Sequence, residues 1–250
     1  MDLGLAGRTV IVTGATGGLG EPIARRFAAE GADVVLAYHE AADAAGKLAA
    51  DLGGRTLVVR YALGEPGSAR ELVDAVLGWS GRVDVLVNNA VRWGTSSAGS
   101  FEDVPDEEWL RVLRDNIEGA VGLSRLVVPH MRERRWGRLV HISSSIAAEG
   151  MAGGEYYGAA KAALHGFSRS AAHSLGKDGD LLSNVVTPGL TRTRTNGHIV
   201  ESVPASYLDQ IPLGRFLDAE EIAAPVVFLA SAANTGITGQ VIAVDAGVTG

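Results

Sequence analysis

Residues 9–20 read TVIVTGATGGLG, and this stretch decides the fold class. The first five residues are all β-branched, which is typical of a strand, and four glycines follow where that strand would pass into a helix. Glycine lets the backbone turn tightly and approach a phosphate closely, while the free N–H groups at a helix start attract negative charge. The spacing is G-x-x-x-G-x-G, which differs from the standard G-x-G-x-x-G fingerprint. An ordinary glycine-rich loop is the alternative, but the position directly after the first strand favours a phosphate-binding turn.

Strand-like and helix-like segments alternate outward from this turn. Helical patterns cover residues 23–28, 41–52 and 69–79, and Asp218 with Glu221 reads as the capped start of a late helix. The seven predicted strands cover residues 9–13, 33–38, 56–60, 83–87, 139–142, 185–187 and 241–244. Their Val, Ile and Leu runs do not alternate with polar residues, which indicates strands covered on both faces. The sequence therefore predicts an α/β fold with a doubly wound, seven-stranded parallel sheet, and residues 1–250 as one domain.

The composition excludes several classes of site and partner. The chain has no cysteine, so disulfides, cysteine-bound zinc, iron–sulfur clusters and thiol nucleophiles are ruled out. A net charge of −7 argues against nucleic acid and anionic membranes as partners. The six histidines are scattered without an H-E-x-x-H pattern, so no metal site is expected. We see no targeting segment and no apolar run long enough to span a bilayer, and we expect a cytoplasmic protein.

Tyr157 and Lys161 are separated by four residues, so a helix would place both on one face. Tyrosine has an ordinary pKa of about 10, and a nearby ammonium favours the phenolate and lowers that value. Tyr156 would point away from Lys161, because five residues separate them. Such a pair also arises by chance in many helices, so its context decides its meaning.

Polar or turn-forming residues follow four of the predicted strands. They are the glycine turn, Asn88 with Asn89 and Ala90, Ser144, and Pro188 with Gly189. In open parallel sheets, ligands bind beyond the carboxyl ends of the strands. These residues should therefore meet at one edge of the sheet, beside Tyr157.

The full set of motifs resembles the short-chain dehydrogenase/reductase family in its short, single-domain form. The resemblance rests on T-G-x-x-x-G-x-G at residues 13–20, N-N-A at 88–90, Asn116, Ser144, Y-x-x-x-K at 157–161, P-G at 188–189 with Thr193, and the closing residues 212–216, 238–240 and 244–247. It covers nearly the whole chain and implies a Rossmann-like fold.

The resemblance also implies catalytic roles. Tyr157 would exchange a proton with a carbonyl or alcohol oxygen, and Ser144 would hydrogen-bond that oxygen. Lys161 would lower the tyrosine pKa and bind the nicotinamide ribose, and Asn116 would hold a water that links Lys161 to solvent. The implied cofactor contacts are Gly14, Thr16, Gly17, Gly18, Leu19, Gly20, Tyr38, His39, Leu63, Asn89, Ala90, Tyr157, Lys161, Pro188, Gly189, Thr191 and Thr193.

The sequence departs from the family pattern at several cofactor positions. Tyr38 stands where an acid commonly binds the ribose 2′-hydroxyl of NAD, so we predict NADP(H) over NAD(H). The basic residues common in NADP-binding relatives are missing, however, because Gly17 and His39 occupy their places. Val91 replaces the glycine of N-N-A-G and should avoid positive φ, and Ala62 replaces an adenine-binding aspartate.

The predicted function is an NADP(H)-dependent ketoreductase that converts a carbonyl to a secondary alcohol. Within the family, the pattern is most similar to 3-oxoacyl-carrier-protein reductases, which implies a small carbonyl or alcohol substrate, carrier-bound or free, and a homotetramer. A sugar, polyol or other secondary-alcohol dehydrogenase and a non-catalytic dinucleotide-binding protein are the alternatives.

Residues 190–209 should form a loop-like substrate lid. Its Arg192 and Arg194 either meet an anionic substrate or are solvated. Arg92, Trp93 and Met151 lie near the predicted cleft mouth, or simply pack.

Overall fold

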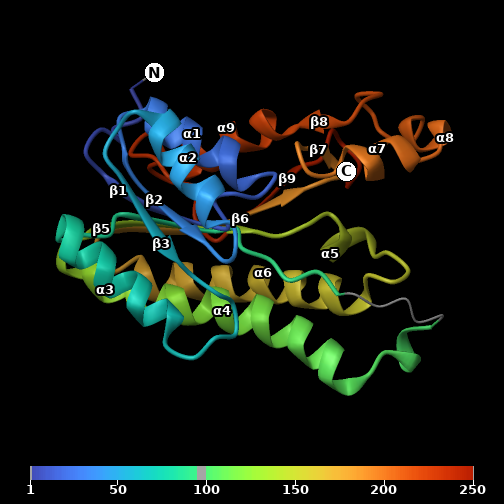
Figure 1. Ribbon diagram of the computed structural model, residues 1–250, viewed down its shortest axis with the longest axis horizontal. Coiled ribbons are helices and arrows are strands. Elements are labelled where there is room, and N and C mark those ends of the chain that lie inside the picture. Colours follow the sequence, from blue (N-terminus) through green and yellow to red (C-terminus); the bar gives the residue numbers. More distant parts are fainter. Residues whose placement is uncertain (1, 95–99, 250) are drawn as a thin grey trace.

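A seven-stranded parallel sheet forms the centre of the protein (Figure 1). The computed structural model describes residues 2–94 and 100–249. In spatial order the strands are β3 (Thr56–Arg60), β2 (Asp33–Tyr38), β1 (Thr9–Thr13), β4 (Val85–Asn88), β5 (Trp136–Ile142), β6 (Asp180–Pro188) and β9 (Val241–Val244). Every neighbouring pair is parallel. The predicted doubly wound sheet is therefore confirmed.

Two layers of helices cover the sheet, one on each face (Figure 1). One layer holds α1 (Gly20–Ala29), α2 (Ala42–Leu52) and α9 (Ala219–Leu229), and the other holds α3 (Ser68–Ser80), α4 (Asp106–Glu133) and α6 (Glu155–Leu175). Alternate side chains of β1 enter opposite cores: Val10 and Val12 pack in the first and Ile11 in the second. All three are fully buried, which explains why the strands lack an alternating polar pattern.

The strand order reverses between β1 and β4. From β1 the chain first builds outward through β2 and β3, then returns to start the other half at β4. At such a switch point the connections leave in opposite directions, and a crevice opens at the carboxyl ends of the strands. The predicted site residues follow these strand ends.

The structure corrects the sequence-based expectation for the segment from 190 to 209. Instead of a loop, it contains β7 (Thr191–Arg192), α7 (Gly197–Ser202) and α8 (Ala205–Leu208), and β7 pairs with β8 (Leu217–Asp218) in a second sheet. Elements of two to six residues carry too little periodicity to be read from sequence. The remaining short elements are α5 (Ile146–Glu149) and η1 (Phe101–Asp103).

The predicted helix start at Asp218 is confirmed by a capping box. The Asp218 side chain accepts from the backbone of Glu221, and the Glu221 carboxylate accepts from the Asp218 N–H. Within the described residues, no helix is long and apolar enough to cross a membrane.

His141 is a buried titratable group in the centre of the sheet. It lies on β5 with 0% exposure, and its Nδ1 is 3.1 Å from Asn88 Nδ2. Because an amide nitrogen can only donate, Nδ1 must be the unprotonated acceptor and Nε2 carries the hydrogen. Nε2 has no hydrogen-bond partner among the described residues. Burial, assisted by the charge of Lys161, lowers the pKa of His141 to about 4.

This histidine should make the fold sensitive to acid. Its folded pKa lies below the unfolded value of about 6.5, so stability is fully present above that pH and falls as pH drops towards 4. We expect His141 to account for about 3 kcal/mol of unfolding free energy over that window. His141→Leu should flatten the pH dependence in urea titrations between pH 7 and 4.5. The exposed His173, changed to Gln, is the matched control. An unchanged slope in His141→Leu would contradict the assignment.

Candidate active site

The glycine turn joins β1 to α1 in a conformation that side chains would block. Gly14 has a φ of +63°, in the left-handed region that L-residues rarely adopt. A Cβ on Gly20 would lie 2.0 Å from the Gly14 carbonyl oxygen, so only glycine lets the first turn of α1 pack against the loop. The turn therefore presents bare backbone at the start of a helix, which suits a phosphate group.

Hydrogen bonds fasten this turn to the end of β4. Asn89 Nδ2 donates to Thr13 O at 2.8 Å and to Gly14 O at 3.2 Å. The Thr13 hydroxyl accepts from the N–H groups of Asn89 and Ala90 and donates to Val87 O at 3.1 Å. The Asn89 side chain thus holds the shape of the turn.

Ser144 and Tyr157 meet above the end of β5. Their side chains share a hydrogen bond that favours the phenolate, but desolvation is the larger effect and raises the pKa of Tyr157 to about 12. The neighbouring Ser145 N–H donates to Pro188 O at 2.9 Å, which ties the end of β5 to the end of β6. The phenol is consequently neutral at physiological pH.

Lys161 is buried one helical turn after Tyr157. Its Nζ donates to Ile142 O at 2.8 Å and lies 5.6 Å from the centre of the Tyr157 ring. Burial lowers the pKa of Lys161 to about 8. Among the described residues, Ile142 O is its one hydrogen-bond acceptor, which leaves two N–H groups for the hydroxyls of a ribose. Desolvation is the largest influence on the pKa of Tyr157, and its lowering by Lys161 stays a prediction.

Asn116 hydrogen-bonds to the segment after β4 and to its own helix. Its Nδ2 donates to Arg92 O at 2.7 Å and Val112 O at 2.8 Å, and its Oδ1 accepts from Arg92 N at 3.2 Å. Both amide donors are therefore used within the protein. The side chain holds the segment after β4, and its link to Lys161 through a water stays a prediction.

The lid reaches across to the glycine turn. A Cβ on Gly18 would lie 2.6 Å from Thr193 Oγ1, so the two residues are in close contact. Arg194 donates to Thr16 O at 3.3 Å, and Thr191 Oγ1 donates to Gly189 O at 2.9 Å. The predicted contacts Thr16, Gly18, Gly189, Thr191 and Thr193 are thus brought together.

The remaining predicted positions lie along the outer strands and beside them. Tyr38 ends β2 opposite Arg60 of β3, and His39 is exposed next to it. Leu63 packs towards Gly119 of α4. The Ala62 N–H already donates to Ser68 Oγ at 2.9 Å. Val91 has no positive φ, as predicted.

Comparison with known proteins identifies the family. The family model described as "Enoyl-(Acyl carrier protein) reductase" matches residues 14–249. The chain belongs to the short-chain dehydrogenase/reductase family. A solved structure described as a "short chain dehydrogenase/reductase family protein" is 35% identical, covers 100% of this chain and 99% of its own, and superposes with a TM-score of 0.88.

Curated relatives match over nearly their whole length. The 3-oxoacyl-[acyl-carrier-protein] reductase FabG of Thermotoga maritima is 33% identical, covering 98% of both chains. The FabG protein of Escherichia coli is 35% identical, covering 97% of both. The meso-2,3-butanediol dehydrogenase of Serratia marcescens is 37% identical, covering 97% of this chain and 94% of its own. The short-chain dehydrogenase/reductase described here is therefore an NAD(P)-dependent oxidoreductase.

The residues present fit a nicotinamide dinucleotide. The turn that a Cβ on Gly20 would obstruct suits a pyrophosphate, and the two spare N–H groups of Lys161 suit a ribose.

Two residues at this site have contacts that the sequence did not predict. The Trp93 ring packs on Tyr157, with ring centres 4.2 Å apart, and Arg60 stands beside Tyr38. Arg60 could have been noticed in the sequence, because it is the basic residue that ends β3, the strand next to that of Tyr38. Trp93 was expected near the cleft mouth, but its contact with Tyr157 could not be predicted, because it depends on a segment held by Asn116 of α4.

Proposed function

We propose that this enzyme is an NADP(H)-dependent ketoreductase that converts a carbonyl to a secondary alcohol. The observation that carries the proposal is the Ser144–Tyr157 hydrogen-bonded pair with Lys161 beneath it, at the strand ends where the glycine turn also lies. A protein that only binds a dinucleotide needs no proton donor there. A sugar, polyol or other alcohol dehydrogenase is the second candidate, supported by the butanediol dehydrogenase relative. A 3-oxoacyl substrate is supported by the names of the FabG relatives.

In the proposed mechanism, Tyr157 donates its phenol proton to the carbonyl oxygen while Ser144 hydrogen-bonds the same oxygen. A neutral phenol is the form needed for reduction, and desolvation keeps it protonated at neutral pH. Lys161 would hold the ribose through its two spare N–H groups, and its positive charge would stabilise the phenolate that forms when Tyr157 gives up its proton. When bound, a nicotinamide dinucleotide supplies the hydride that is added to the carbonyl carbon. Asn116 positions the wall of the site through Arg92.

Replacing Tyr157 with Phe should abolish turnover but preserve cofactor binding. The change removes only the proton donor, and we expect loss of at least about a hundredfold in kcat. The assay is NADPH absorbance loss over β-keto esters, quinones and cyclic ketones, with NADPH affinity measured by fluorescence.

Tyr156→Phe is the matched control, because the Tyr156 hydroxyl donates to Phe101 O, away from Lys161. Full activity in Tyr157→Phe would refute the mechanism, and a wild-type enzyme that reduces none of these carbonyls would refute the function.

The preference for NADP(H) is supported by the charges at the ends of β2 and β3. Tyr38 supplies no carboxylate to repel a 2′-phosphate, and Arg60 lies opposite it in register. The Arg60 guanidinium is held by both oxygens of Glu65, at 2.8 and 2.6 Å. The hydrogen bond from Arg60 and, to a smaller extent, the charge of His39 lower the pKa of Glu65. The three groups are therefore close together. Arg60 and His39 are thus the basic side chains at this place, and a 2′-phosphate would compete with Glu65 for Arg60.

Changing Arg60 and changing Glu65 should shift NADPH affinity in opposite directions. Arg60→Gln removes a charged donor for the 2′-phosphate and should weaken NADPH binding about tenfold with little change for NADH. Glu65→Gln frees Arg60 from its carboxylate and should strengthen NADPH binding. Dissociation constants from fluorescence titration test both. Arg55→Gln is the control, because Arg55 pairs with Asp33 at the opposite end of β2. A wild-type preference for NADH would defeat the proposal.

We further propose that residues 1–250 act as one NAD(P)-binding domain in a cytoplasmic homotetramer. Family precedent supports assembly through α4, α6 and the C-terminal segment. Size-exclusion chromatography with light scattering should give the mass of four chains, and a clean monomer would refute it.

A further inference from the structure

The segment after β4 places an aromatic wall against the proposed proton donor. Asn116 holds Arg92 by its backbone N–H and carbonyl, and the Arg92 side chain pairs with Asp115. With Arg92 fixed on both sides, the ring of the next residue, Trp93, packs against the Tyr157 ring, with ring centres 4.2 Å apart and planes tilted by 45°. Trp93 is nevertheless 49% exposed. The indole therefore contacts the phenol ring and still offers an exposed surface.

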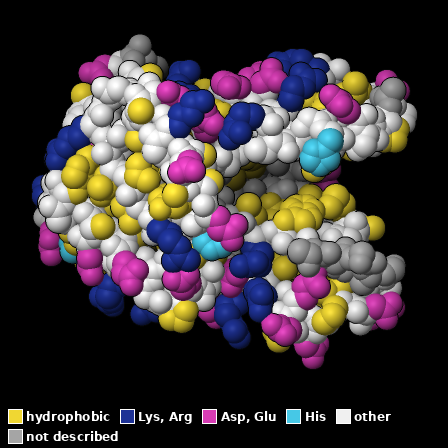
Figure 2. All heavy atoms as spheres, viewed as in Figure 1, with side chains coloured by type: hydrophobic (Ala, Val, Ile, Leu, Met, Phe, Trp, Pro, Cys, Tyr) yellow, Lys and Arg dark blue, Asp and Glu magenta, His cyan; other side chains and the backbone are white. Residues whose placement is uncertain are grey.

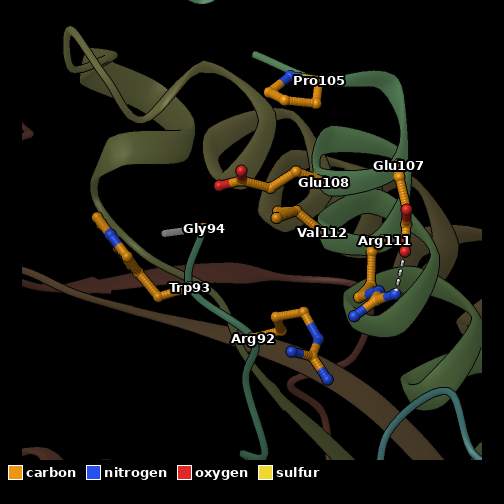
Figure 3. Close-up of a pocket in the computed structure, with 8 residues that line it drawn as sticks. All are labelled: Arg92, Trp93, Gly94, Pro105, Glu107, Glu108, Arg111 and Val112. Atoms are coloured by element: carbon orange, nitrogen blue, oxygen red, sulfur yellow. Dashed lines mark hydrogen bonds and ion pairs between the residues drawn. The ribbon is translucent and has the colours of Figure 1, made fainter. Parts of the chain in front are cut away.

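Trp93 also lines a pocket of about 350 Å³ formed by the segment after β4 and residues around the start of α4. Figure 3 shows Trp93 on one side of this pocket and side chains of α4, Glu108 and Val112, on the other. The arginines in its wall are already neutralised: Arg111 pairs with Glu107 at 2.7 Å, and Arg92 pairs with Asp115. The pocket thus presents no surplus positive charge on its described residues.

The arginines of residues 190–209 are also paired with carboxylates. On the lid, Arg192 lies 3.5 Å from Asp218, and Arg194 lies 3.3 Å from Glu21. Exposed apolar side chains occur on three segments that adjoin the site: Val91 after β4, Met151 after α5 and Ile199 in α7. Figure 2 shows hydrophobic side chains gathered inside the hollow that opens between the two arms of the molecule. A phosphate-bearing carrier arm would have to displace these carboxylates from the arginines.

We infer that Trp93 contacts the substrate, and that the site takes an uncharged cyclic or aryl ketone in preference to an acyl group carried on an anionic arm. The inference rests on the proposed ketoreductase function. The flat face of such a ketone packs on the exposed part of the indole while its carbonyl oxygen lies at Tyr157 and Ser144. A ketone that is held by packing on the indole needs no charged partner in the protein. This agrees with the arginines near the site, which are paired with carboxylates.

The first test compares substrates in the wild-type enzyme. An aryl ketone should have a higher kcat/KM than a short acyclic ketone. The uncharged N-acetylcysteamine thioester of acetoacetate should be reduced at least as efficiently as acetoacetyl-coenzyme A, which carries phosphates. A clear preference for the coenzyme A thioester, or for the acyclic ketone, would overturn the inference while leaving the ketoreductase proposal intact. Absence of any carbonyl reduction would instead refute the proposed function.

The second test changes the indole. Trp93→Ala should lower the ratio of aryl to acyclic kcat/KM about tenfold, mainly through a higher KM for the aryl ketone, and Trp93→Phe should restore most of it. Trp109→Ala is the matched control, because Trp109 stacks on Tyr156, the neighbouring tyrosine. Binding of the aryl alcohol product should also weaken in Trp93→Ala, as measured by calorimetry. If Trp93→Ala lowers both ketones equally and leaves product binding unchanged, Trp93 serves only to support Tyr157, and the inference is wrong.

Discussion

The junction between β1 and β4 is the constraint on which the rest of the structure depends. These strands belong to the two halves of the sheet, and the Thr13 hydroxyl and Asn89 amide bond their carboxyl ends together. Without those bonds, the Thr13 carbonyl would lose the Asn89 donor at the point where the strands diverge, and the Gly14 carbonyl would keep the Gly17 N–H. The same bonds fix the glycine turn relative to the segment that carries Trp93. One small polar cluster therefore sets the distance between the proposed cofactor turn and the wall of the substrate site.

Desolvation governs the proton chemistry of this site. It raises the pKa of Tyr157 to about 12 and lowers that of Lys161 to about 8, so both groups are driven towards their neutral forms. The phenol accordingly retains the proton that a reduction requires, while Lys161 is still largely protonated at neutral pH. His141 lies under the same helix, and part of its low pKa comes from the Lys161 charge. A neutral His141 avoids a second positive charge next to Lys161, at the expense of acid stability.

The parts of this fold that follow local rules could be predicted from the sequence. All seven strands of the main sheet were expected because β-branched runs between glycines are strong local signals, although β6 begins at Asp180, five residues before its predicted start. The helix cap at Asp218 could be predicted because its partner, Glu221, lies only three residues later in the sequence. The partners of Asn116, the packing of Trp93 and the pairing of β7 with β8 could not be predicted. Each depends on which distant segments the sheet brings together, and a side-chain amide fits a water or a backbone equally well until its neighbours are known.

Polar and apolar side chains occupy different parts of the proposed site. Ser144, Tyr157 and Lys161 cluster at the floor, where they can fix a single oxygen and a ribose, whereas Trp93 and the exposed side chains around it determine shape. Arg194 links the lid to Thr16 of the glycine turn and is balanced by Glu21 of α1. Residues 190–209 are bonded to the glycine turn in this way, so a shift of Thr16 when a dinucleotide binds would change an Arg194 contact. In the proposed function, selection of the ketone by apolar walls would then be coupled to the cofactor through the Arg194 side chain.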